Sequence, residues 1–552
     1  MNTKVKYTIL SAVIGVLCVS CDSFLDQAPD NRVEWNSPSQ ISDLLVSAYS
    51  GANYALMCEL SSDNFVDNNS PDPSTGAYYN LNARERWYDE IFAWKDIVTA
   101  GSEQDTPSYV WSACYQAIAV ANSALEAIKK LEDAGRGNEV TAQKGEALLS
   151  RAYHHFILVN IFAKAYRNDE LSKQDIGIPY VTEPETTVFV DYDRTTVTDV
   201  YQKIEKDLLE GLPLIADGYN VPKYHFNTKA AHAFAARFYL FKRNYQQVIA
   251  NANQILGADA SQMMRDWNHE TPTGESLGHW YINATSNDNL LLVSTGSWFS
   301  RVFGSRYSCN RDAAKATIYG TGPTWDNYNF HPCYDGRLFY RGQQEYGLFF
   351  MKAYEFFEYT DKIAGIGLGH IVRAEFTAEE TLLCRAEAYL LSGQKALAIA
   401  DLKTWDESRR VIKNTLTMEQ IPNKDLTETI IRTFYTKNTN EIFRNAIHTT
   451  EMSPDFVVNT NDKPILDCIL HFRRLETIFD GMRWFDIKRF GIEISHRVGK
   501  STPDVLKWDD PRRALQLPPE VVVAGLTPNE RLVLGVNNAY VDVHSANVSY
   551  LK

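Results

Sequence analysis

Residues 228–256 read TKAAHAFAARFYLFKRNYQQVIANANQIL and carry a clear helical pattern. Residues at steps of three or four share one face of an α-helix. The small and aromatic residues that recur in this way are Ala231, Ala235, Phe238 and Tyr239. The pattern breaks at Arg243-Asn244 and then resumes from Tyr245. The stretch therefore predicts two consecutive helices joined by a short turn, the first starting near Thr228.

The same pattern returns later in the chain. Ala236–Leu240 (ARFYL) is similar to Ala386–Leu390 (AEAYL), and each is followed by a polar turn and a second Ala-bearing segment. Small residues allow two antiparallel helices to approach closely. The arrangement loosely resembles the tetratricopeptide type of helix pair, and such pairs stack because each alone leaves an apolar face exposed.

Two kinds of sequence pattern alternate along the chain. Helical periodicity extends over about residues 106–256 and again over about 370–490, with Thr198 as the expected N-cap of one helix. Residues 53–105 and 267–369 are rich in aromatic and turn-forming residues, with a short strand expected at Leu290–Thr295. Long ordered loops in a folded protein are usually functional, so these two regions are the candidates for a binding face.

Composition excludes several classes of function. The 552 residues are 44% hydrophobic and 22% charged, which is typical of a globular protein. The net charge of −14 argues against nucleic acid or anionic lipid headgroups as ligands. No apolar run after the first twenty residues is long enough to span a membrane.

The first 21 residues look like a lipoprotein leader. Lys4 and Lys6 precede the apolar run Ile9–Val19, which is too short to cross a bilayer but suits a signal peptide. Leu17-Cys18-Val19-Ser20-Cys21 resembles a bacterial lipoprotein box. We expect residues 1–20 to be removed and Cys21 to carry the lipid, including palmitate. The alternative is an ordinary signal peptide that is cut elsewhere.

The other cysteines give little information. Cys114 and Cys384 lie in apolar helical segments and are expected to be buried thiols. Cys309 and Cys333 are close enough in sequence to suggest a bridge, but sequence alone does not establish the pairing.

A series of short motifs follows in a fixed order along nearly the whole chain after Cys21. They are Cys21–Asp26, Ser61-Ser62-Asp63, Trp111 to Asn122, Arg151-Ala152-Tyr153 with Phe156, Thr198 to Leu208, Lys229 to Leu240, Glu379 to Ala388 and Phe472 to Arg489. Each motif is weak alone, but in this order and spacing they resemble the SusD/RagB family, the surface-exposed nutrient-binding lipoproteins of Bacteroidetes.

The resemblance implies a mainly α fold, with residues 21–552 as one domain. Four tetratricopeptide-like helix pairs would lie on one side and an irregular ligand face on the other. It also implies a partner, a SusC-like TonB-dependent outer-membrane barrel over which the lipoprotein closes as a lid. The expected ligands are oligosaccharides, and some relatives bind peptides. The protein would then act at the outer membrane, on the cell surface, without catalysis and without a cofactor.

Sugar binding requires a specific mixture of side chains. The C–H face of a pyranose stacks on an aromatic ring, while its hydroxyl groups need polar partners. The residues of the two loop regions that fit this mixture are Asp67, Tyr78, Tyr79, Asn80, Trp298, Arg301, Tyr307, Trp325, Asn327 and Tyr328. The alternative is that these aromatic side chains hold the long loops onto the helices.

Other chemistries find little support. The charged block Arg473–Arg489 could be an acid/base site, but we favour a salt-bridged structural helix. His154 and His155 are adjacent, so they point about 100° apart on a helix and cannot hold one metal together. The acidic group from Asp63 to Asp72 lacks the spacing of the known calcium loop, so no metal is expected.

Two other functions stay open on sequence alone. Any two carboxylates can meet in space, so a surface glycoside hydrolase is one alternative. The other is a purely architectural subunit that caps a transporter without binding a ligand.

Overall fold

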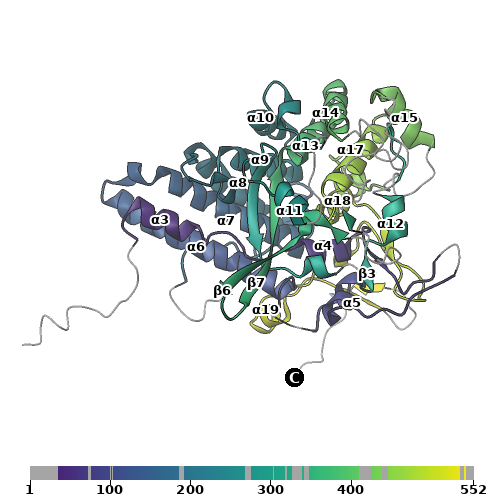
Figure 1. Cartoon of the computed structure of the whole chain (residues 1–552), viewed down its shortest axis with the longest axis horizontal. Helices are drawn as coiled ribbons and strands as arrows, with labels where there is room; N and C mark the ends of the chain where they lie inside the picture. The colour runs from purple at the N-terminus through teal and green to yellow at the C-terminus, as the bar shows by residue number, and fades with distance from the viewer. Residues whose placement is uncertain are drawn as a thin grey trace, which may run out of the picture.

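Helices dominate the structure, a computed structural model (Figure 1). It describes residues 35–72, 76–99, 101, 103–185, 192–267, 275–302, 304–317, 320–325, 339–340, 347, 349–409, 424–437, 446–534 and 540–542. The helices are α3 (Pro38–Leu45), α4 (Ala55–Ser61), α5 (Arg86–Phe92), α6 (Pro107–Asp133), α7 (Thr141–Phe162), α8 (Val197–Gly211), α9 (Thr228–Lys242), α10 (Tyr245–Leu256), α11 (Glu275–Tyr281), α12 (Arg311–Ala316), α13 (Ala378–Leu391), α14 (Lys395–Ser408), α15 (Glu428–Lys437), α16 (Thr449–Met452), α17 (Lys463–Glu476), α18 (Met482–Phe490) and α19 (Pro519–Val523). The prediction of a mainly α fold is confirmed.

The strands are short and few by comparison. They are β1 (Val66–Asp67), β2 (Asn289–Thr295), β3 (Tyr307–Ser308), β4 (Phe339–Tyr340), β5 (Phe349–Phe350), β6 (Glu355–Asp361), β7 (Ile366–Thr377), β8 (Ile494–His496), β9 (Asp504–Leu506), β10 (Leu532–Leu534) and β11 (Tyr540–Asp542). The predicted strand Leu290–Thr295 is confirmed as β2.

The stretch that opened the sequence analysis forms two helices, as predicted. Helix α9 begins after Asn227, whose side chain accepts a hydrogen bond from the backbone N–H of Ala230 at 3.0 Å. It ends at Arg243, which takes the left-handed conformation with φ of 62°. Asn244 then caps α10 by accepting from the N–H of Gln247. The break at Arg243-Asn244 is therefore a C-cap followed directly by an N-cap.

The predicted N-cap of α8 was wrong by two residues. The cap is Thr196, whose hydroxyl accepts from the N–H of Asp199 at 3.1 Å, while the Asp199 carboxylate accepts from the N–H of Thr196 at 3.2 Å. This reciprocal capping box needs an acid three residues after the cap, which Thr198 lacks. The Thr198 hydroxyl is buried and donates to the carbonyl of Asp169 instead.

The long helices pack in pairs along the chain. Helix α6 lies against α7, α9 against α10, and α13 against α14, and α10 and α13 join the last two pairs. Figure 1 shows α6 and α7 extending to one side, while α13, α14, α15 and α17 form the opposite end. Small residues let the helices come close: Ala230, Ala231, Ala235 and Ala236 of α9 are all fully buried.

A three-stranded antiparallel sheet has the order β2-β7-β6, so β7 is central. Strand β2 pairs only with Ile371–Thr377 of β7, because Thr295 lies opposite Ile371 and Asn289 opposite Thr377. The earlier half of β7 pairs with β6 alone. Strand β7 runs directly into α13, where the Thr377 hydroxyl accepts from the N–H of Glu380 at 3.2 Å.

The core lies between this sheet and the helices. The Tyr153 ring of α7 lies 5.6 Å from the Phe234 ring of α9 and 5.7 Å from the Phe376 ring of β7. All three side chains are buried. Edge-to-face contacts of this kind add to the gain from burying apolar area, so they join the sheet to the helical layer.

The two ends of the described fold meet. The carboxylate of Asp63 pairs with Arg483 at 2.8 Å and with Arg474 at 3.2 Å. The ring of His496 stacks on Phe92 and Trp94, with centroids 4.2 Å apart in each case. We call these contacts between residues 59–99 and 474–500 the terminal clasp. It fixes the first loop region onto the C-terminal part of the chain.

Candidate binding site

The two loop regions singled out in the sequence lie side by side. Strand β1 of the first pairs with β3 of the second, with Val66 opposite Ser308 and Asp67 opposite Tyr307. The N–H of Asn68 then donates to the carbonyl of Arg306 at 2.8 Å. The predicted ligand residues that the structure describes have different surroundings within these two regions.

Asp67 faces the interior. Its carboxylate pairs with Arg306 at 2.9 Å and accepts from the N–H of Gly499 at 2.8 Å and of Asn69 at 2.9 Å. The side chain is fully shielded from solvent. Its oxygen atoms are already used to join three parts of the chain, which is a structural role.

Tyr307 and Trp325 are also buried. The Tyr307 hydroxyl donates to Asp89 at 2.5 Å, and its ring stacks on Phe92 at 4.4 Å. The Trp325 indole N–H donates to the carbonyl of Gly320 at 3.0 Å. These rings hold loops onto the core, as the alternative interpretation expected. Two further predicted residues, Asn327 and Tyr328, lie outside the described residues.

Tyr78, Tyr79 and Asn80 form an exposed cluster with Lys500. The exposed fraction is 51% for Tyr78 and 37% for Tyr79, which is high for aromatic side chains. The Lys500 ammonium donates to the Tyr78 hydroxyl at 2.6 Å and lies 3.8 Å from the centre of its ring. This hydrogen bond and the positive charge lower the pKa of Tyr78. The cluster offers two rings, an amide and a cation to solvent.

Trp298 and Arg301 form a second exposed cluster with Arg84 and Glu355. The guanidinium carbon of Arg84 lies 5.6 Å from the centre of the partly exposed Trp298 ring. Arg301 pairs with Glu355, with Nε 2.6 Å from Oε2. Burial acts to raise the pKa of Glu355, but hydrogen bonds from Arg301 and Ser300 outweigh it and lower the pKa. The carboxylate is therefore ionised at neutral pH.

Trp298 is held from below by Asp105. This buried carboxylate accepts from the Trp298 N–H at 2.7 Å and from the Ser297 hydroxyl at 2.6 Å. Asp105 lies directly before Thr106, the N-cap of α6. The rigid start of the longest helix thus positions the loop that presents the indole.

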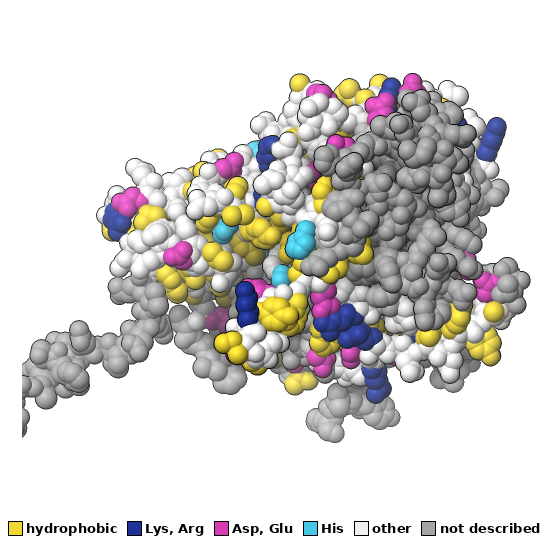
Figure 2. Space-filling view, in the orientation of Figure 1, with side chains coloured by type: hydrophobic (Ala, Val, Ile, Leu, Met, Phe, Trp, Pro, Cys, Tyr) yellow, Lys and Arg dark blue, Asp and Glu magenta, His cyan; other side chains and the backbone are white. Residues whose placement is uncertain are grey.

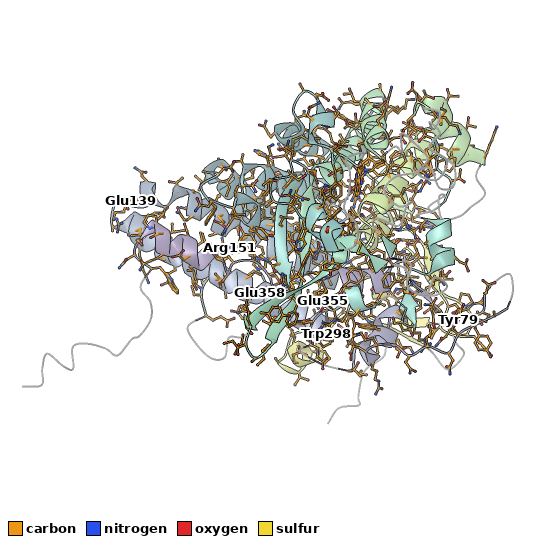
Figure 3. All side chains as sticks on the ribbon, in the orientation of Figure 1. Tyr79, Glu139, Arg151, Trp298, Glu355 and Glu358 are labelled. Atoms are coloured by element: carbon orange, nitrogen blue, oxygen red, sulfur yellow. The ribbon has the colours of Figure 1, made fainter. Side chains whose placement is uncertain are left out.

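The two clusters are separate sites on one side of the molecule. Figure 3 shows Tyr79 well apart from Trp298 and Glu355, which lie near the base of the β6–β7 hairpin. Sequence reasoning missed four residues of the clusters, namely Arg84, Asp105, Glu355 and Lys500. Lys500 is 422 residues from Tyr78 in sequence, so no local pattern links them.

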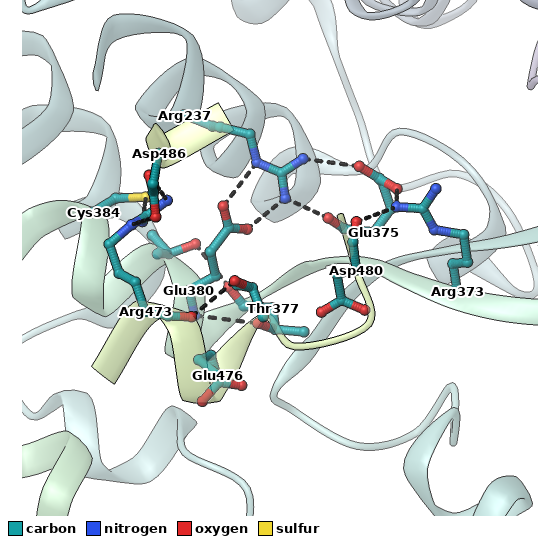
Figure 4. A network of polar contacts seen from close by, with 12 residues as sticks. Arg237, Arg373, Glu375, Thr377, Glu380, Cys384, Arg473, Glu476, Asp480 and Asp486 are labelled. Atoms are coloured by element: carbon teal, nitrogen blue, oxygen red, sulfur yellow. Dashed lines mark hydrogen bonds and ion pairs between the residues drawn. The ribbon is translucent and has the colours of Figure 1, made fainter. Parts of the chain in front are cut away.

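The charged block Arg473–Arg489 is a buried ionic network. Arg473 pairs with Asp486 at 3.1 Å, and Arg489 pairs with Glu387 at 2.8 Å. Figure 4 shows Arg473 and Asp486 beside Arg237, Glu375 and Glu380. The expected ion pairs are present, but they are buried between helices and not exposed on one. Lys488 is the exception in this block: it donates to the carbonyls of Asn160 and Ala163, and burial lowers its pKa to about 7. A buried network of this kind is typical of a framework.

Metal sites find no support in the part of the chain that the structure describes, where no group of three or more His, Cys, Asp or Glu side chains could hold an ion. His154 and His155 bond separately to the carbonyls of Ser150 and Arg151. Asp63 and Asp67 are in the ion pairs given above.

The residues predicted to attach the protein to a membrane lie outside those that the structure describes. Among the described helices, none has the length and apolar character needed to cross a bilayer. The predicted leader, the lipid-bearing Cys21 and Cys333 lie outside the described residues. Cys309 is buried and bonds to no described cysteine.

Comparison with known proteins gives a family match and a shared fold. Residues 23–240 match the model of the SusD-like family described as starch-binding and associating with the outer membrane. No curated protein sequence matches the chain.

Several solved structures are similar over most of the chain. A SusD superfamily protein from Bacteroides thetaiotaomicron has a TM-score of 0.58 at 16% identity, over 90% of this chain and 100% of that one. A putative sugar binding protein from Bacteroides vulgatus has a TM-score of 0.60 at 18% identity, over 90% and 99%. At such identities the similarity shows a common fold. Residues 23–240 are thus similar to the SusD-like family, and the chain shares its fold with solved structures of the SusD superfamily.

Proposed function

We propose that the protein is a lipid-anchored binding protein of the cell surface that captures oligosaccharides and delivers them to a SusC-like TonB-dependent outer-membrane transporter. The observation that carries the carbohydrate part is the match of residues 23–240 to a family described as starch-binding. A similar solved structure is described as a putative sugar binding protein, which agrees with it.

The exposed clusters support this ligand class. Tyr78, Tyr79 and Trp298 present aromatic faces that can stack on the C–H face of a sugar ring. Lys500, Arg84 and Arg301 lie beside them as hydrogen-bond donors for hydroxyl groups. Rings and donors together suit a neutral polyol better than an apolar or a highly charged ligand.

The proposed lipid anchor and the delivery of the ligand to a transporter are supported by other observations. The lipoprotein box that ends at Cys21 supports a lipid anchor, and the family description supports a place at the outer membrane. Transport partners of the SusC type are what the family resemblance implies. We further propose that the ligand is passed on unchanged, because Arg473, Asp486 and Arg489 of the charged block are ion-paired and buried inside the framework.

The test is binding of the purified protein to a panel of soluble polysaccharides, beginning with starch, by affinity gel electrophoresis and calorimetry. Trp298→Ala and Tyr79→Ala should each weaken binding by up to about tenfold, the range expected for one stacked ring. Tyr224→Ala is the matched control, because Tyr224 is 37% exposed like Tyr79 but lies outside both clusters.

The result separates the proposal from its alternatives. If the protein binds peptides but no polysaccharide, its ligand is a peptide and not an oligosaccharide. Shortened glycan products would indicate an enzyme. A protein that binds neither, yet supports uptake when Trp298 is replaced, would be an architectural subunit.

A further inference from the structure

The outer half of the β6–β7 hairpin extends beyond the sheet as a two-stranded ribbon. Strand β2 covers β7 only from Ile371 onward, so residues 356–361 and 366–370 pair only with each other. A two-stranded ribbon without a packed face gains little stability of its own. Even so, the ribbon carries several large exposed apolar side chains, which are Phe357, Tyr359, Ile363, Ile366 and Leu368. Such a concentration at one place marks an interaction site more often than chance.

The aromatic side chains of the ribbon share one face. Phe357 and Tyr359 are two residues apart on one strand, so they point to the same side. Their rings lie 4.9 Å apart at an angle of 80°, and their exposed fractions are 52% and 53%. In Figure 2, yellow apolar side chains lie over this hairpin, next to dark-blue basic and magenta acidic side chains near its base.

Two glycines on the opposite strand make room for this face. Gly369 lies opposite Phe357, and Gly367 lies opposite Tyr359. A Cβ atom at Gly367 would come within 2.6 Å of Cε1 of Phe357, so the ring lies across the glycine backbone. Any side chain at Gly367 would displace the ring, and one at Gly369 would collide with the Glu355 carboxylate. Because these two glycines have no side chains, the aromatic rings of β6 can lie against the backbone of β7 and keep one side open to solvent.

A polar edge borders the rings. Glu355 precedes Phe357 by two residues on the same face and accepts from the Ser300 hydroxyl at 2.8 Å and from Arg301. The Arg301 side chain is 41% exposed, and its Nη1 bonds to no residue that the structure describes. The edge therefore offers a donor from Arg301 and acceptor oxygen atoms from Glu355, beside exposed rings.

We propose that this face of the hairpin, formed by Phe357, Tyr359 and the Arg301–Glu355 pair, is a sugar-stacking subsite that continues the Trp298 cluster. One pyranose of a longer oligosaccharide stacks on the face of one ring and contacts the edge of the other, while its hydroxyl groups bond to the charged edge. The inference rests on the proposed function and extends it. It gives a long oligosaccharide a second binding point, on a hairpin that no sequence motif indicated.

The chemistry favours a sugar over a protein partner as the occupant. The opposite face of the ribbon carries Ile366 and Leu368, exposed by 60% and 65%, together with the exposed Glu358 and the half-buried rings of Phe356 and His370. A protein that gripped the ribbon would bury both faces. The Phe357 side carries the more exposed rings beside the Arg301–Glu355 pair, which is the mixture that a neutral polyol needs.

The experiment compares the two faces in the purified protein. Phe357→Ala and Tyr359→Ala should each weaken binding to the polysaccharide identified in the panel by about tenfold. The conservative variants Phe357→Tyr and Tyr359→Phe keep the rings and should bind within about twofold of wild type. Leu368→Ala is the matched control on the opposite face and should bind like wild type. Circular dichroism checks that each variant is folded.

Three outcomes would overturn the inference in distinguishable ways. If both alanine variants bind like wild type while Trp298→Ala weakens binding, the subsite is wrong and the proposed function stands. If Leu368→Ala weakens binding as much as Phe357→Ala, the loss is not specific to the Phe357 face and the stacking subsite is wrong. If wild type binds no polysaccharide of the panel, the subsite and the proposed function fail together.

Discussion

At the scale of single residues, Asp105 combines an unusual backbone with a buried carboxyl group. Its φ of 68° lies in the left-handed region, which Asp adopts more readily than most residues. That conformation turns the carboxylate toward Ser297 and the N–H of Trp298. The side chain is fully buried, and burial raises its pKa to about 7. One residue thus connects the start of α6 with the indole of the second cluster.

This raised pKa predicts a pH dependence of stability. An acid whose pKa is higher in the folded state stabilises the fold fully below its unfolded pKa of about 3.9 and loses that contribution as the pH rises toward 7. The difference between the unfolded pKa of about 3.9 and the folded pKa of about 7 corresponds to up to about 4 kcal/mol of unfolding free energy. Asp105→Asn keeps a neutral side chain, so urea unfolding of this variant should lack that decline between pH 4 and 7. Parallel curves for the two proteins would contradict the assignment.

At the scale of elements, Arg237 joins α9 to the junction of β7 and α13. Its guanidinium donates to Glu375 at 2.8 Å and to Glu380 at 2.9 Å, and all three side chains are buried (Figure 4). Burial acts to raise the pKa of Glu375, but Arg373 and Arg237 outweigh it and lower the pKa. The carboxylate therefore stays charged in the interior only because its arginine partners are present.

Arg237→Met should destabilise the protein by about 3–5 kcal/mol, because it leaves two buried carboxylates short of a partner. Lys130→Met is the control, since the Lys130–Glu126 pair on α6 is largely exposed and should contribute less than about 1 kcal/mol. Chemical unfolding followed by circular dichroism measures both. If both variants lost the same free energy of unfolding, the buried network would contribute no more to stability than an exposed ion pair.

The helices could be predicted from sequence because their signals are local. The turn at Arg243-Asn244 is visible within a few residues, and the spacing of Ala231 and Ala235 indicates the buried face of α9. The partners of Arg237 are 138 and 143 residues away, so no periodicity shows them. Thr196 and Thr198 are equally good cap residues by type, and only the reciprocal bond to Asp199 identifies Thr196 as the cap.

The candidate site was predicted less well for the same reason. Residue type indicated rings and polar groups but not their burial. Tyr78 and Trp298 are accessible, whereas Tyr307 and Trp325 have the same chemistry and are buried. The aromatic face of β6 was missed because Gly367 and Gly369 resemble ordinary loop residues until their pairing with Tyr359 and Phe357 is known.

At the scale of the whole molecule, the terminal clasp joins two segments that lie about four hundred residues apart in the sequence. Asp63 lies between Arg474 and Arg483, and the N–H of Gly481 donates to Glu59 at 2.9 Å. Burial acts to raise the pKa of Asp63, but the two arginines outweigh it and lower the pKa well below its usual range. The clasp therefore closes a loop of more than four hundred residues.

Asp63→Asn should destabilise the protein by about 3 kcal/mol at neutral pH, because two buried guanidinium groups lose their counter-charge. A lowered pKa stabilises the fold above the unfolded value of about 3.9 and ceases to do so as the pH falls toward the folded value. The difference from wild type should thus be constant from pH 5 to 7 and shrink below pH 4. Asp133→Asn, in an exposed pair with Lys129, should change little. A difference that grew in acid would refute this account.

The clasp also bears on the order in which the molecule can be completed. A polypeptide that crosses a membrane from its N-terminus delivers Asp63 and Tyr78 long before Arg474 and Lys500 arrive. The helix pairs can assemble in the meantime, since their contacts are mostly between neighbours in sequence. The Tyr78 surface then forms last, and only in molecules synthesised through residue 500. A chain that ends before residue 500 would keep most of its helices and would lack the Lys500 partner of Tyr78.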